Sequence, residues 1–198
     1  MNFVRDEKTK IFKAYSDSVL RIENKSLGYM LSIILDSLVY IPNEYIRFRF
    51  YTSFKELTAV TEEEKQTWEN NRQKTYLDSP KHFFYSLVHN RLNDDYYILF
   101  RLLDSSTKDS KIEKRILPKD IDLTCVSDST IYKLHFNGLL EIRRRNLNPP
   151  GELFFYHSLS IDEYGNLLTP FPNVKISGIW AKQGIADTLP LDYIYDGN

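Results

Sequence analysis

The segment from Trp68 to Leu92 holds the residues of this chain whose types and spacing could do chemistry. Trp68, Arg72 and Tyr76 recur every four residues, so on a helix they form one stripe of two aromatic rings and a guanidinium. Such a stripe could hold a sugar, a peptide carboxylate or a side chain of a partner. It could also anchor a polar helix to a sheet, because a helix with few apolar residues needs large anchors. We favour the anchoring role.

Three further polar candidates, Ser79, His82 and Arg91, follow on the next expected helix. Ser79 precedes Pro80, and the pair fits the N-cap and first position of a helix. A serine and a histidine three residues apart could instead act as nucleophile and base. The N-cap role explains Ser79 fully, and the sequence has no Gly-x-Ser-x-Gly elbow. We therefore favour a structural role for Ser79, and expect Arg91 to bond a helix end or a strand carbonyl.

Metal and disulfide chemistry find no support in the residue spacing. None of the four histidines has a glutamate three residues later, and no His-Glu-x-x-His motif is present. His82 and His89 share a helix face, but about 10 Å of helical rise separates them, too far to bind one ion. Cys125 is the only cysteine, which excludes an internal disulfide and a zinc site made of cysteines. We expect no metal and no cofactor, and a buried, inert thiol.

Glu23 and Trp180 are secondary candidates. Glu23 stands near the end of an expected strand, where its carboxylate could pair with Arg72 or Arg91, whereas Trp180 is expected to anchor the segment that follows it. The basic run 143–145 is expected to be the solvated end of a strand. The formal net charge of −1 provides no overall field for nucleic acid, and no glycine-rich phosphate loop is present. We expect no nucleic-acid partner.

Local patterns predict the elements that position these residues. Thr61 and Glu64 have the spacing of a capping box, which predicts a helix over 62–77. A second helix is expected from Pro80 to about Leu92, with a broad apolar face. Alternating or continuous apolar runs predict strands over residues 11–23 (two short strands), 29–40, 46–50, 97–103 and 153–161.

The C-terminal third is expected to be rich in strands. Asn137 and Gly138 form a strong turn signal between two apolar runs, 131–136 and 139–145. A bulged turn would align the apolar residues of both runs on one face, so we predict a bulged hairpin. The final stretch GIWAKQGIADTLPLDY predicts a strand that runs into a short helix ending at Pro190.

Together these patterns predict an α+β fold. It comprises a largely antiparallel sheet that could be strongly curved, an inserted two-helix hairpin around 61–92, and a short C-terminal helix. We expect a single domain, 1–198, with a mobile loop at about 104–117. The N-terminus lacks the apolar core of a signal peptide, and the longest apolar run, 29–40, is too short to span a bilayer. We expect no direct membrane insertion.

Several motifs also resemble a known family. They are IENKSLGY (22–29), WENNRQKTY (68–76), SPKHFFYSL (79–87), SIDEYGN (160–166) and GIWAKQGIADTLPLDY (178–193). In this order they resemble the C-terminal region of Gram-negative envelope proteins called carboxypeptidase-like regulatory domain-containing proteins. The chain departs from that pattern at Asp78, Tyr85 and Gly184. The resemblance implies a periplasmic or cell-envelope location, although the chain carries no signal peptide, and a preceding β-sandwich that this chain lacks. It implies no peptidase activity.

These observations predict a non-enzymatic module that binds or scaffolds an unknown envelope protein or glycan. Two alternatives remain open. One is an unrecognised hydrolase or lyase that uses His82 with Ser79 or a carboxylate. A concave pocket holding His82, Arg72 and a carboxylate would indicate it. The other is a purely structural extension that stabilises the missing β-sandwich.

Overall fold

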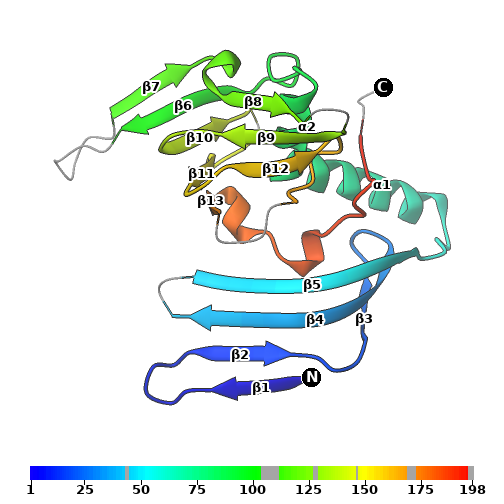
Figure 1. Cartoon of the computed structure of the whole chain (residues 1–198). Coiled ribbons are helices and arrows are strands. Elements are labelled where there is room, and N and C mark those ends of the chain that lie inside the picture. The colour runs from blue at the N-terminus through cyan, green and yellow to red at the C-terminus, as the bar shows by residue number, and fades with distance from the viewer. Residues whose placement is uncertain (43–44, 104–111, 127–128, 146, 169–172, 196–198) are drawn as a thin grey trace. The chain divides into compact units, whose positions relative to one another are not determined.

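The computed structural model describes residues 1–42, 45–103, 112–126, 129–145, 147–168 and 173–195 (Figure 1). Strands hold 43% of this part of the chain and helices 20%, so the protein is mostly β. The described residues form several antiparallel sheets, one of them curled into a half-barrel, and two helices. The predicted α+β class is therefore wrong. The chain divides into two compact units, Met1–Arg72 and Gln73–Asn198, and the division falls inside the first helix.

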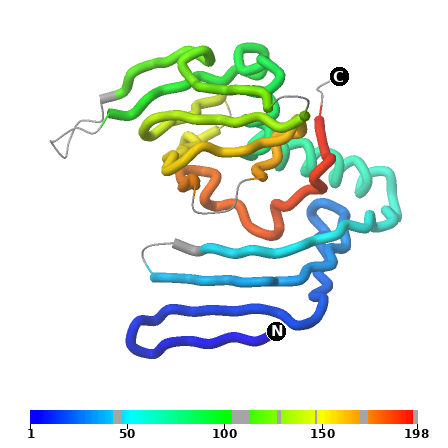
Figure 2. Tube along the Cα trace, viewed as in Figure 1, coloured from blue at the N-terminus to red at the C-terminus, as the bar shows by residue number. Residues whose placement is uncertain are grey.

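The first unit is built on a five-stranded antiparallel sheet. Its strands are β1 (Asn2–Arg5), β2 (Phe12–Tyr15), β3 (Leu20–Asn24), β4 (Tyr29–Ile41) and β5 (Tyr45–Glu56). The long strand β4 pairs with β5 along its whole length, and on its other edge with β3 and then with β2 (Figure 2). The strand predicted over 29–40 is thus confirmed and lies in the interior of the sheet, but only one of its faces is buried.

The two faces of this sheet differ in character. Along the first part of β4, Tyr29, Leu31, Ile33 and Leu35 are buried, and the residues between them face the other way. Residues directly opposite on paired strands share a face. One face is therefore apolar and partly buried, and the other is exposed to solvent. A β-bulge after Leu35 accommodates one extra residue of β4, so paired residues of β4 and β5 lie on the same face along the full length of both strands.

The two helices begin as their capping residues predict. In α1 (Glu62–Leu77) the amide of Glu64 donates to Thr61 Oγ1 at 3.1 Å, and the Glu64 carboxylate accepts from the amide of Val60 at 2.8 Å. The second helix, α2 (Pro80–Val88), ends four residues before the predicted end. Asn90 stops it by adopting a left-handed conformation, with φ of 56°, as asparagine does at helix ends.

The second unit contains two further antiparallel sheets. One has the strand order β13-β11-β10-β6-β7 and the other the order β12-β9-β8. Their strands are β6 (Ile98–Leu103), β7 (Ile112–Ile116), β8 (Asp122–Cys125), β9 (Ile131–His135), β10 (Leu139–Arg143), β11 (Gly151–Phe155), β12 (Leu159–Asp162) and β13 (Val174–Gly178). One apolar cluster joins both sheets to α2. It includes Phe83, Leu134, Leu140, Leu153 and Leu159, all fully buried.

The hairpin predicted at Asn137 and Gly138 is wrong. Strand β9 pairs with β8 and β12, whereas β10 lies in the other sheet between β6 and β11. Burial explains the difference, because Leu140 and Ile142 are fully buried in a central strand that needs a neighbour on each edge. Gly138, with φ of 102°, lets the chain turn from one sheet into the next.

The predicted C-terminal helix is also wrong. After β13 the chain forms two short 3₁₀ segments, η2 (Ile179–Lys182) and η3 (Ile185–Asp187), separated by a break at Gly184. Of the loop predicted at about 104–117, residues 104–111 lie outside the described part of the chain, and residues 112–116 form β7. In the described part of the chain, no helix is long and apolar enough to cross a membrane.

Candidate functional site

Trp68 fixes the loop that connects β3 to β4. Its indole N–H donates to the carbonyl of Lys25 at 2.8 Å, and the side chain is almost fully buried. The ring lies directly over Gly28, where an added Cβ would stand 2.3 Å from the indole carbons. Gly28 also has a φ of 67°, which L side chains rarely adopt. Only glycine therefore suits this position.

Arg72 binds the same loop one helical turn later. Its Nε donates to the carbonyl of Leu27 at 2.7 Å, and its Nη2 donates to that of Gly28 at 3.3 Å. The guanidinium stacks on the ring of Tyr29 at 4.0 Å, and Nη1 bonds the Glu56 carboxylate at 2.8 Å. The planar, forked guanidinium suits several acceptors at once. Arg72 therefore ties the loop to the helix and to the end of β5.

Asn71 completes this set by donating to the carbonyl of Ser26 at 2.9 Å. Three side chains of α1 thus bind the carbonyls of four successive residues, 25 to 28, which we call the 25–28 loop. Backbone carbonyls of a connecting loop need such partners when they are withdrawn from water. No sequence pattern indicates these hydrogen bonds, because any residue type supplies a carbonyl.

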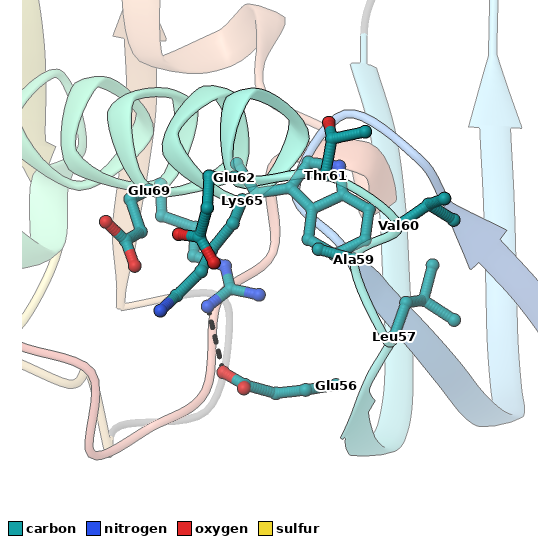
Figure 3. Close-up of a pocket in the computed structure, with 10 residues that line it drawn as sticks. Glu56, Leu57, Ala59, Val60, Thr61, Glu62, Lys65 and Glu69 are labelled. Atoms are coloured by element: carbon teal, nitrogen blue, oxygen red, sulfur yellow. Dashed lines mark hydrogen bonds and ion pairs between the residues drawn. The ribbon is translucent and has the colours of Figure 1, made fainter.

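A groove of about 420 Å³ lies beside the start of α1 (Figure 3). Its lining consists of Glu56, Leu57, Ala59, Val60, Thr61, Glu62, Lys65, Trp68, Glu69 and Arg72. Figure 3 shows the charged ends of Glu62, Lys65 and Glu69 projecting from the helix on the side of the Arg72–Glu56 ion pair. Val60 is 89% exposed at the rim. The groove therefore combines three carboxylates and two cations with a small apolar edge.

Tyr76, the third residue of the predicted stripe, belongs to the second unit and does not line the groove. It is fully buried, and its ring meets those of His82 and Tyr193 edge-on, with centroids 5.1 and 5.7 Å away. Of the predicted stripe, the groove thus brings together Trp68 and Arg72 only.

Ser79 caps α2, and its hydroxyl meets backbone groups. The hydroxyl accepts from the amide of His82 at 3.2 Å and donates to the carbonyl of Tyr76 at 2.6 Å. The His82 imidazole instead bonds the Tyr97 hydroxyl through Nδ1 at 2.8 Å. A serine nucleophile needs its hydroxyl on the imidazole of its base. Here the Ser79 hydroxyl bonds backbone groups and the His82 imidazole bonds Tyr97, so the two side chains are not arranged as nucleophile and base.

His82 lies in a buried polar cluster. Its Nε2 is 3.8 Å from the carboxylate of Asp95, which also accepts from Ser86 Oγ at 2.7 Å. Burial, and secondly the positive charge of Arg144, lower the pKa of His82 to about 4. The ring is therefore neutral at pH 7. Burial likewise raises the pKa of the Tyr97 hydroxyl, so this group keeps its proton.

Two arginines complete the cluster around Asp95. Arg91 forms an ion pair with the Asp95 carboxylate at 3.5 Å, and Arg144 donates to the carbonyls of Asp95 and Leu77 at 3.0 and 2.8 Å. The sequence singled out Arg91 but not Asp95, and it predicted that 143–145 would be the solvated end of a strand. Apart from the Arg91–Asp95 pair, these contacts join residues far apart along the chain and leave no local pattern.

Lys81 is a further titratable group that the sequence did not single out. Its amine donates to the carbonyls of Pro190 and Leu191, at 3.1 and 2.5 Å. Burial lowers the pKa of Lys81 to about 8, and the negative charges of Asp162 and Asp192 oppose the shift. The amine serves to hold the C-terminal segment.

The remaining candidates lie apart from the groove. Glu23 is exposed on β3, opposite Met30. Trp180 is buried against Gly151, and its indole N–H donates to the carbonyl of Asp78 at 3.1 Å. Cys125 is exposed at the end of β8, so the predicted burial is wrong. Within the described residues, no group of histidine, cysteine or acidic side chains could hold a metal ion.

Comparison with known proteins gives no relative from which to transfer a function. No family model, no curated protein and no solved structure matches the chain. The resemblance to the C-terminal region of carboxypeptidase-like regulatory domain-containing proteins stays a prediction that rests on its motifs.

Proposed function

We propose that this chain is a non-enzymatic binding or scaffolding module of the cell envelope, and that the groove beside the start of α1 receives its partner. One observation carries the proposal. Trp68 and Arg72, the large side chains that could have done chemistry, bind the 25–28 loop and form a fixed wall of the groove. Exposed charged and apolar side chains line its open side. A fixed wall with a solvated, mixed-charge rim suits recognition.

The exposed lining gives this groove its recognition chemistry. Glu62, Lys65 and Glu69 offer both signs of charge within one helical stripe, and Val60 and Leu57 offer apolar contact. A partner with alternating polar and apolar groups, such as a protein segment or a glycan, can match such a surface. The envelope location follows from the motif resemblance alone.

The geometry favours binding over hydrolysis. The groove contains Arg72 and carboxylates, whereas His82 is buried in the second unit and bonded to Tyr97. No histidine, serine or cysteine is present among the described lining residues. A hydrolase or lyase built on His82 and Ser79 would need both groups open to substrate.

A matched pair of substitutions tests the proposal. Glu62 and Glu63 both stand in the first turn of α1, so changing either to lysine has the same effect on charge and on the helix dipole. Only Glu62 lines the groove. A photo-crosslinking residue at Val60, in cells of the native host, should give a discrete adduct. Glu62→Lys should abolish that adduct and Glu63→Lys should retain it.

Three results would contradict the proposal. The first is the absence of an adduct at Val60, and the second is an adduct that survives Glu62→Lys unchanged. The third is turnover of an ester, peptide or glycoside substrate that His82→Ala removes while circular dichroism shows an intact fold.

A further inference from the structure

The exposed face of the first unit's sheet carries a concentration of positive charge. Register places five cationic side chains on the face opposite the buried Tyr29 and Leu31. They are Lys13 on β2, Arg21 on β3, and Arg47, Arg49 and Lys55 on β5. All five residues are exposed. We call this surface the basic face.

Acidic side chains on the basic face offset only part of this charge. Glu23 is opposite Met30, next to Lys55 in the cross-strand row, and Asp36 at the bulge forms an ion pair with Arg49 at 2.5 Å. Cations thus outnumber acids on the face, although the whole chain has a formal net charge of −1. The positive potential is local, and an overall charge count does not reveal it.

Exposed apolar and aromatic side chains stand among these cations. Val4 is 66% exposed, Tyr51 65%, Tyr15 47% and Ile34 46%. Val4 is opposite Lys13, and Ile34 is opposite Tyr51. A solvated sheet face usually carries polar residues at such positions. The basic face therefore combines cations that attract anions with apolar and aromatic side chains whose removal from water is energetically favourable.

The arrangement of the charges is two-dimensional. On β5, Arg47 and Lys55 are separated by about 27 Å at the usual rise per strand residue. Lys13 and Arg21 stand level with Arg47 and Ser53, two strands across the sheet, so the array is also roughly 10 Å wide. A single linear polyanion would follow one row of charges, whereas a broad anionic surface meets the whole array.

We propose that the basic face adsorbs to the surface of an anionic phospholipid bilayer. Lysine and arginine side chains meet the headgroup phosphates, while Tyr15, Tyr51 and Ile34 enter the interfacial layer, where tyrosine is favoured. The chain stays peripheral. This docking does not depend on the groove beside α1, which has different lining residues.

Vesicle co-sedimentation of the full chain tests the inference. The protein should bind vesicles of phosphatidylglycerol and phosphatidylcholine, should not bind vesicles of phosphatidylcholine alone, and should bind less as salt is raised. Replacing Lys13, Arg21 and Lys55 together by glutamine should weaken binding about a hundredfold, since each cation near such a surface contributes roughly fivefold.

A second triple variant provides a control of equal charge. Lys119→Gln, Lys175→Gln and Lys182→Gln remove three exposed lysines of the second unit and should leave vesicle binding within about twofold of wild type. Equal weakening in both triple variants, or no binding of the wild type to anionic vesicles, would overturn the inference. Tighter binding to heparin or to a single-stranded DNA oligonucleotide than to anionic vesicles would also overturn it. Loss of vesicle binding would leave the Val60 adduct unchanged, so the two proposals fail separately.

Discussion

Acid should destabilise the second unit through His82. The pKa of this ring is about 4 in the folded protein, against a usual value of 6.5, so the unfolded chain binds the proton more tightly. Stability therefore falls as pH drops below about 6.5 and continues to fall until about pH 4. The linkage relation gives a loss of about 2 kcal/mol between pH 7 and pH 5 from this residue alone.

Urea denaturation at pH 7 and at pH 5 measures this loss. His82→Gln retains a group that can bond the Tyr97 hydroxyl but cannot take up the proton, so its stability should change about 2 kcal/mol less between the two pH values than that of the wild type. His157→Gln changes an exposed histidine and should behave as wild type. If wild type and His82→Gln lose the same free energy of unfolding on acidification, His82 does not cause the acid destabilisation.

Three further changes have expected outcomes. Gly28→Ala should lower the free energy of unfolding by about 2–4 kcal/mol in chemical denaturation, because the added Cβ meets the Trp68 ring and the φ of Gly28 is positive. Gly138 also has a positive φ, but an added Cβ there meets open space, so Gly138→Ala should cost only about 1 kcal/mol. Equal losses in the two variants would contradict the packing of Trp68 on Gly28. Ser79→Ala should cost about 1 kcal/mol in the same assay through loss of the N-cap, and no change would deny the cap. Cys125 should react with a thiol reagent in the native protein at the rate of an exposed thiol, and protection until unfolding would contradict its exposure.

Capping signals and apolar runs allowed much of the local structure to be predicted. Thr61 and Glu64 located the start of α1 because a capping box acts within four residues. The run 29–40 indicated a strand because it is a nearly continuous apolar segment, although only one face of β4 is buried. These features depend on neighbours in the sequence, so the sequence contains the information directly.

The same patterns could not predict which strands, distant in the sequence, pair with each other in a sheet. Asn137 and Gly138 signal a turn, but they do not decide whether the flanking strands pair with each other, and here each pairs with other strands. The segment 178–193 has helix-like spacing, yet Gly184 breaks it into short 3₁₀ segments. Sheet composition depends on which apolar faces meet, and that is a property of the whole unit.

The candidate site was predicted in part. Trp68 and Arg72 were recognised from their types and spacing, but their partners are backbone carbonyls, which no side-chain pattern marks. Gly28 could have given a weak signal, since a glycine next to a strand can mark a close backbone approach, but the sequence does not place it beside Trp68. Asp95 has a local i, i+4 partner in Arg91, but its contacts with Ser86 and Arg144, which come from separate elements, leave no local pattern.

Arg72, with Trp68, holds the 25–28 loop and so forms the fixed wall of the groove. Hydrogen–deuterium exchange of Arg72→Lys measures this restraint, because lysine keeps the charge and loses the fork that binds two carbonyls. The amides of residues 24–31 should exchange faster than in the wild type, while β10 stays unchanged and the exposed Arg21→Lys behaves as wild type. Unchanged exchange over 24–31 in Arg72→Lys would contradict the claim.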